Sequence, residues 1–165
     1  MADGSGHALM RSIVAVSIGV IALTSLWMPE RVASHFGADG LANGYITRGT
    51  YVAFLAGVAI GIPTLLSLGI GATIRRSPGA LNIPNRDYWL APARQQESVD
   101  FLVGHTARPA AGVAIFALGL HFVLIHANSL SPPRLEGAWA ITPLAGGLAG
   151  VAVWIIALSR RFRLP

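Results

Sequence analysis

Four long apolar segments alternate with polar stretches along the chain. They cover residues 8–28, 51–74, 109–127 and 138–158. A helix that crosses the hydrocarbon core of a bilayer needs about 20 mostly apolar residues, and each segment has close to that length. The pattern therefore predicts an all-α, polytopic membrane protein with four transmembrane helices, folded as a single membrane domain over residues 1–165.

The first segment could instead be a signal peptide that is removed after export. It ends in Trp27-Met28-Pro29, which lacks the small residues of a typical cleavage site. We therefore expect this segment to remain as the first membrane span.

The first long connection, residues 29–50, carries strong turn signals. Asp39-Gly40 and Asn43-Gly44 are dipeptides that suit tight turns with positive φ. We therefore expect a short ordered outer loop with two turns. Phe36, Leu41 and Tyr45 are expected to pack as a small apolar cap on the mouth of the bundle.

The second long connection, residues 75–108, divides into two parts. Its first part is punctuated by prolines and is expected to be irregular. After Pro92 the chain has few helix breakers, and Val99, Leu102 and Val103 fall at helical spacing. The pattern predicts a longer cytoplasmic loop that contains an amphipathic helix leading into the third span.

Composition also points to lipid as the solvent. Apolar residues make up 53% of the 165 residues and charged residues only 12%, which is about half the charged share of a soluble domain. The chain has no cysteine, so disulfides, thiolate nucleophiles and cysteine-ligated metal centres are excluded.

Charge predicts the orientation of the spans. All twelve basic residues are arginine, and the formal net charge is +5. Nine of the arginines fall on the side shared by the two termini and the middle loop, and three fall on the other side. Cytoplasmic loops are enriched in basic residues, so we expect both termini and residues 75–108 in the cytoplasm. Because the arginines flank apolar runs, no nucleic-acid partner is expected.

Ionisable residues inside the spans are scarce, which restricts the chemistry. No Asp or Glu lies within an apolar segment, and His121 and His126 are five residues apart, so they diverge by about 140° around a helix. We expect His121 to hydrogen-bond within the bundle and His126 to lie at the headgroups. No catalytic residue, metal site or cofactor is predicted, and the chain is not expected to be an enzyme.

Two kinds of residue in the spans suggest how the helices sit. Trp27, Tyr51 and Trp139 lie at predicted outer boundaries, where aromatic rings prefer the headgroups.

Small residues recur at four-residue spacing, as Gly57 with Gly61 and Gly146 with Gly150. Such pairs let helix backbones approach closely, and packing within the bundle is the favoured interpretation. The alternative is contact with another membrane protein or a second copy of the chain.

The outer loop holds the first set of candidate binding residues. They are His35, Phe36, Asp39, Asn43 and Tyr45. As a structural residue, His35 would hydrogen-bond a turn carbonyl or Asp39. As a functional residue, it would be a metal ligand or a pH-sensitive contact. One histidine with one aspartate is a weak metal signal, because a stable site uses three or four ligands.

The cytoplasmic loop holds the second set, candidates for binding a ligand or lipid. They are Asn82, Asn85, Arg86, Asp87 and Trp89. One interpretation is a loop on the membrane surface, with Tyr88 and Trp89 among the headgroups and Arg86 on an anionic phosphate. The other is a small cap that binds lipid or a partner through Arg86 and the asparagine amides.

These two stretches resemble the DUF1648 family of bacterial integral membrane proteins. The first motif is matched by Pro29, His35-Phe36, Gly40 and Asn43-Gly44-Tyr45, and a second motif that often follows is matched by Asn82, Pro84, Asn85, Arg86, Tyr88, Trp89 and Pro92. The resemblance runs to about residue 100. The same domain lies at the front of SdpI-type proteins, which give immunity to a secreted toxin and signal to a repressor. The chain lacks a clear match to the rest of such a protein, so this role is an analogy.

Taken together, the residues and the resemblance predict a non-enzymatic, multi-pass protein of the bacterial cytoplasmic (inner) membrane. It would act by binding a ligand or partner, in envelope stress, immunity or signalling. One alternative is an accessory or structural subunit of a larger membrane complex. Another is a small transporter or membrane enzyme that uses His35 and Asp39. The expected partners are membrane lipids and, through the glycine pairs, another membrane protein or a second copy.

Overall fold

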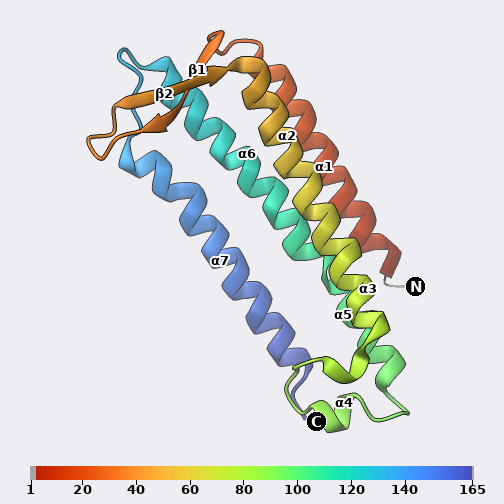
Figure 1. The fold of residues 1–165 in the computed structure, drawn as a ribbon. Helices are drawn as coiled ribbons and strands as arrows, with labels where there is room; N and C mark the ends of the chain where they lie inside the picture. The colour runs from red at the N-terminus through yellow and green to blue at the C-terminus, as the bar shows by residue number, and fades with distance from the viewer. Residues whose placement is uncertain (1–2, 165) are drawn as a thin grey trace.

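The computed structural model describes residues 3–164 and consists mainly of long helices (Figure 1). In chain order the elements are α1 (Asp3–Ser25), β1 (Arg31–Phe36), β2 (Ala42–Thr47), α2 (Arg48–Thr64), the π-helical segment η1 (Leu65–Ile70), α3 (Gly71–Arg76), the 3₁₀ turn η2 (Pro78–Ala80), α4 (Arg86–Trp89), α5 (Gln95–His105), α6 (Ala107–Ser129) and α7 (Gly137–Arg161).

Four helical stretches of the described chain are long and apolar enough to cross a membrane. They are Ser5–Ser25, Arg48–Arg76, Gln95–Ser129 and Gly137–Arg161. The prediction of a mainly helical chain with four apolar helices of membrane-spanning length is therefore confirmed. The third stretch begins earlier than predicted because α5 leads almost directly into α6, and α5 occupies the place where the sequence predicted an amphipathic helix.

The second span changes its hydrogen-bond pattern part-way along. Pro63 has no N–H to donate to the preceding turn, and the π-helical segment η1 begins two residues later. Helices α2, η1 and α3 nevertheless continue as one rod (Figure 1).

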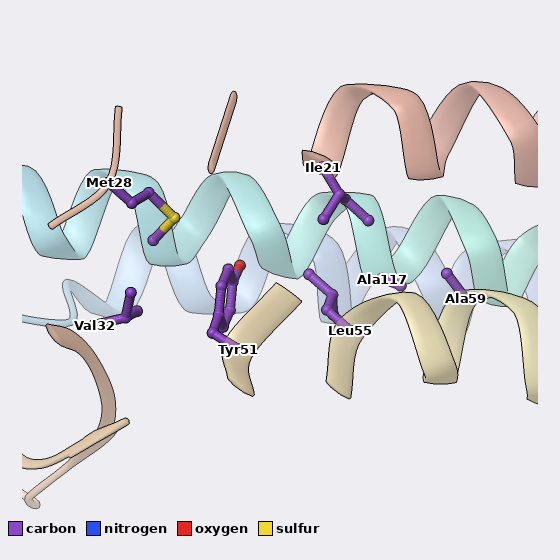
Figure 2. Close-up of a cluster of buried hydrophobic side chains, with 7 residues drawn as sticks. All are labelled: Ile21, Met28, Val32, Tyr51, Leu55, Ala59 and Ala117. Atoms are coloured by element: carbon purple, nitrogen blue, oxygen red, sulfur yellow. The ribbon is translucent and has the colours of Figure 1, made fainter. Parts of the chain in front are cut away.

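Helices α1, α2 and α6 form the core of the bundle. Figure 2 shows Ile21, Leu55, Ala59 and Ala117 meeting between these helices, and each is at most 4% exposed. Alanines on the buried side of α6, such as Ala114, are fully covered. Small side chains at such an interface let neighbouring helices pack closely through dispersion contacts.

Helix α7 packs less deeply than the others and has no buried residue. It meets α6 through two glycines. A methyl group built on Gly119 would lie 3.0 Å from Cβ of Pro143, and one on Gly147 would lie 3.4 Å from the ring of Phe116. In Figure 1, α7 lies on the outside of the bundle, beside α6.

The prediction that the recurrent glycine pairs pack the bundle internally is wrong. A methyl group built at Gly57, Gly61, Gly146 or Gly150 would have no atom of another turn or helix within 4 Å. Four-residue spacing marks a face of a helix but does not say which neighbour covers it, and here Gly119 and Gly147 make the close helix contact instead.

The bundle has two distinct ends (Figure 1). At the hairpin end, β1 and β2 form a two-stranded antiparallel sheet. At the cap end, residues 77–98 meet the last residues of α7, and α1 begins in this half of the molecule. The first long connection, residues 29–50, thus contains a β-hairpin, which corrects the purely α-helical expectation.

Candidate functional site

The hairpin is closed by a single tight turn. The Gly37 N–H donates to the carbonyl of Leu41 (2.8 Å), and the Gly40 N–H donates to that of Gly37 (2.9 Å). Gly40 has φ +80°, a left-handed conformation that glycine adopts without strain. The carboxylate of Asp39 accepts the N–H of Leu41 (3.0 Å), a local bond that is typical of Asp in turns. The predicted turn at Asp39-Gly40 is confirmed.

The predicted turn at Asn43-Gly44 is wrong, because both residues lie within β2. Gly44 pairs with His35 at an irregularity in the strand register. A methyl group on Gly44 would lie 2.9 Å from Cβ of His35, so only glycine fits opposite this histidine. The Asn-Gly dipeptide therefore serves cross-strand packing rather than chain reversal.

Hydrogen bonds to the segment before α7 hold the tip of the hairpin. The Ala42 N–H donates to the carbonyl of Pro133 (3.1 Å), and the Leu135 N–H donates to that of Gly40 (2.8 Å). Leu41 and Arg134 form an isolated antiparallel bridge between the same segments. A hairpin alone is marginally stable in water, and this third segment supplies the missing pairing.

Asn128, near the end of α6, holds the base of the hairpin. Its Oδ1 accepts the N–H of Ala33 (2.8 Å), and its Nδ2 donates to the carbonyls of Ala33 (3.1 Å) and Leu124 (2.8 Å). Ala33 and the adjacent Val32 have no exposed surface. The predicted apolar cap therefore consists of other residues, since Tyr45 is 43% exposed while Val32 fills the mouth of the bundle.

Arg48, which directly follows β2, attaches the base of the hairpin to the end of the first helix. Its Nη1 donates to the carbonyls of Leu26 (3.1 Å) and Met28 (2.9 Å), just beyond the end of α1. A cation is favourable there, because the last carbonyls of a helix carry partial negative charge. The wall of a shallow pocket of about 340 Å³ includes Arg48 together with Glu30 and Arg31.

The candidate residues of the hairpin differ in how exposed their side chains are. His35, Asp39, Asn43 and Tyr45 are exposed, and Phe36 is partly buried. Nδ1 of His35 lies 3.2 Å from the hydroxyl of Ser34, whereas the structural prediction named a turn carbonyl or Asp39 as its partner, so that prediction is wrong. These exposed side chains lie on a hairpin whose backbone is held by hydrogen bonds to Asn128 and to residues 133–135.

A buried hydrogen-bonded network lies under the hairpin, between α1, α2 and α6. Its centre is His121, which has no exposed surface. The hydroxyl of Tyr51 lies 2.6 Å from its Nδ1, and the hydroxyl of Thr24 lies 2.6 Å from its Nε2. Thr24 also donates to the carbonyl of Val20. All three side chains are therefore satisfied when Nε2 of His121 carries the proton.

The prediction that His121 hydrogen-bonds within the bundle is confirmed, but that for Tyr51 is wrong. Tyr51 is only 3% exposed and does not sit among headgroups. Its ring stacks beside the imidazole of His121 at 5.8 Å. Sequence position alone cannot separate an interfacial tyrosine from one turned into the bundle.

His126 lies at the hairpin end, where α6 gives way to α7. Its Nε2 lies 3.0 Å from a carboxylate oxygen of Glu136, and its ring stacks on Trp139 at 4.2 Å. These contacts join the end of α6 to the start of α7. Among the described side chains, residues 5–164, no three His, Asp or Glu groups gather closely enough to hold a metal ion.

At the cap end, the second sequence motif encloses Phe162. The Nδ2 of Asn85 (2.9 Å) and the indole N–H of Trp89 (3.0 Å) both donate to the Phe162 carbonyl. The Phe162 side chain has no exposed surface and makes edge contacts with Trp89 and Phe101. Asn85 has φ 53°, a left-handed conformation that asparagine tolerates.

Arg161 closes this aromatic cluster from the side. Its guanidinium lies 4.5 Å from the ring centre of Trp89 and donates to Glu97 (2.7 Å). Stacking on an aromatic face and pairing with a carboxylate are both favourable for arginine. The last turn of α7 is therefore attached to α4 and α5.

The candidate residues of the second long connection, residues 75–108, differ in role. Asn85 and Trp89 hold Phe162, and Arg86 donates to the carbonyl of Gly79. The N–H of the Trp89 indole is used inside the cap, while the place of this partly buried ring among headgroups stays a prediction. Asn82 and Asp87 are exposed at the surface of the cap.

No family model, curated protein or solved structure matches this chain significantly.

Proposed function

We propose that the chain is a non-enzymatic protein of the bacterial inner membrane, of the DUF1648 type, that acts by binding a ligand or partner at its hairpin end. One observation carries the proposal. The hairpin is fixed through its backbone by Asn128 and by residues 133–135, while the side chains of His35, Asn43 and Tyr45 remain exposed. A preorganised surface loses little conformational entropy on binding.

Tyr45 is the natural centre of such a contact. It is 43% exposed on a strand whose backbone cannot move freely. Tyrosine is enriched among the residues that dominate binding energy, because it combines a large apolar ring with a polar hydroxyl. Asn43 lies two residues before Tyr45 on the same strand, and His35 faces Gly44 from the paired strand, so both offer hydrogen-bonding groups at this end.

The orientation of the spans supports the same proposal. The cap end and both chain ends carry nine of the twelve arginines, and the positive-inside rule puts that side in the cytoplasm. The hairpin then faces away from the cytoplasm, where secreted or envelope ligands are met. Both termini are cytoplasmic in this arrangement.

Photo-crosslinking in living cells tests the proposal. A benzophenone amino acid replaces Tyr45, and in a matched control it replaces Trp27, which is 75% exposed near the same end but outside the hairpin. We expect a discrete adduct at Tyr45 that is absent at Trp27. Identical adduct patterns at the two positions, or none at Tyr45, would argue against binding through the hairpin.

A second candidate function is that of an accessory subunit in a larger membrane complex. It is favoured by α7, which has no buried residue, and by the open space beside Gly146 and Gly150. Backbone close to a helix surface is a typical contact for another membrane helix. A crosslinker at Leu148, which is 63% exposed on α7, would capture a protein neighbour in this case and only lipid otherwise.

A further inference from the structure

A groove between α1 and α6 at the cap end combines apolar walls with a basic mouth. It has a volume of about 470 Å³. Its walls include Leu9, Met10, Ala111, Gly112 and Ile115, and Arg108 lies at its cap-end rim. Ile115 is seven residues beyond Arg108, which is about 10 Å along a helix axis. The groove is therefore charged at its Arg108 end and apolar at its Ile115 end, and a phospholipid likewise has a charged headgroup and apolar acyl chains.

Arg108 is held in place at the rim and makes no ion pair with any carboxylate among the described side chains, residues 5–164. Its Nη1 lies 3.0 and 2.6 Å from the two ring nitrogens of His105. The two acidic residues of the neighbouring α5 are occupied elsewhere, Glu97 with Arg161 and Asp100 with Arg75. The charge of Arg108 is therefore positioned but not neutralised by the described chain.

The wall of the groove is open at Gly112, which has no side chain to fill it. A methyl group built on Gly112 would have no neighbouring atom within 4 Å, although Gly112 lies on the wall. On the opposite side, α1 lies next to the start of α6, since a methyl group built on Gly6 would make an ordinary contact of 3.8 Å with Cβ of Ala107. The open space beside Gly112 therefore results from the way α1 and α6 pack against each other.

From this geometry we infer that the groove is a binding site for an anionic phospholipid. The phosphate of the headgroup pairs with Arg108, and an acyl chain lies along Gly112 toward Ile115. Basic residues between transmembrane helices on the arginine-rich side are typical of such sites. Bidentate pairing with phosphate is a property of the planar guanidinium. This site is separate from the hairpin and does not depend on the function proposed for it.

Native mass spectrometry of the detergent-purified protein, titrated with phosphatidylglycerol or phosphatidylcholine, tests the inference. We expect tighter binding of phosphatidylglycerol. Arg108→Gln should weaken that binding about fivefold, the loss expected for one basic residue at an anionic surface. Gly112→Leu should reduce it at least as much, because the added side chain fills the groove. Thermal unfolding in phosphatidylcholine verifies that both variants remain folded.

Two controls match these variants. Arg76→Gln removes the same charge at the same end outside the groove, and Gly150→Leu adds the same bulk on an open helix face. Neither should change the affinity for phosphatidylglycerol, and glycerol 3-phosphate should not compete. The inference is overturned if the controls weaken binding as much as Arg108→Gln and Gly112→Leu, if those two variants bind normally, or if glycerol 3-phosphate displaces the lipid.

Discussion

Gly44 and His35 face each other across the hairpin with no room for a second side chain. The clash that a methyl group would make involves Cβ of His35 at 2.9 Å, and a Cβ atom can move only together with its backbone. The dipeptide Asn43-Gly44 therefore looks like a turn in the sequence but is constrained by packing between strands. At this position, the distance to one atom, Cβ of His35, decides that the residue is glycine.

Replacing Gly44 with alanine should destabilise the protein by about 1–3 kcal/mol, since overpacking forces the strands apart. The measurement is thermal or denaturant unfolding in detergent. Gly49→Ala is the control, because a methyl group there meets no neighbouring atom. Equal stability of the two variants would contradict the cross-strand account.

Asn128 provides a second test at the residue scale. Asn128→Ala removes three hydrogen bonds and leaves the N–H and carbonyl of buried Ala33 without these partners. We expect a loss of about 1–3 kcal/mol and faster hydrogen exchange in β1. Asn43→Ala, at an exposed position of β2, should leave both quantities unchanged. If exchange in β1 stays slow in Asn128→Ala, another group holds the hairpin.

The helices are joined by a small number of specific contacts rather than by apolar surface alone. Lipid tails are as apolar as leucine, so burial gives helices in a membrane little reason to associate. The network of Thr24, Tyr51 and His121 links α1, α2 and α6 directly below the hairpin. It fixes the relative rotation of these three helices, because His121 on α6 bonds at a defined distance to one hydroxyl from each of the other two helices.

Removing one hydroxyl from this network should have a measurable but modest effect. Tyr51→Phe should lower the free energy of unfolding by about 0.6–2 kcal/mol, the range for interhelical hydrogen bonds in membranes. Tyr45→Phe, which removes the same hydroxyl from an exposed ring, is the control. A double-mutant cycle with Thr24→Val would show coupling through His121. Purely additive losses would mean that the hydroxyls act independently.

Helix α7 is attached at both ends, in addition to its glycine contacts with α6. At one end His126 stacks on Trp139, and at the other Phe162 is buried in the cap. Phe162→Ala should remove about 3 kcal/mol of stability from the cap and raise hydrogen exchange over residues 85–98. Leu164→Ala, at a 55% exposed position two residues on, should do neither. Unchanged exchange in Phe162→Ala would show that α7 is held by other contacts.

Local patterns predicted the spans, whereas the sites depend on contacts between distant residues. Length and apolarity are properties of one segment, so the four helices and the turn at Asp39-Gly40 could be found from the sequence. The bonds that shape the sites join residues 95 apart for Ala33 and Asn128, 97 apart for Thr24 and His121, and 77 apart for Asn85 and Phe162. A single sequence contains no signal for such pairs.

As a whole molecule, the chain places its two conspicuous motifs at opposite ends of a membrane-length bundle (Figure 1). The hairpin carries the first motif and the cap carries the second, with helices long enough to cross the bilayer between them. The hydrocarbon core is about 30 Å thick, so the two motifs cannot line one site. The proposed binding at the hairpin and the inferred lipid site at the cap end are therefore separate and are tested separately.

Cysteine accessibility is the most direct test of this arrangement, because the chain has no native cysteine. Asn43→Cys and Ser77→Cys both place the thiol at an exposed position, one in the hairpin and one at the cap end. In intact cells, a membrane-impermeant maleimide should label position 43 at once and position 77 only after the inner membrane is permeabilised. Labelling of both positions in intact cells, or of position 77 alone, would contradict the four-span account with the hairpin outside.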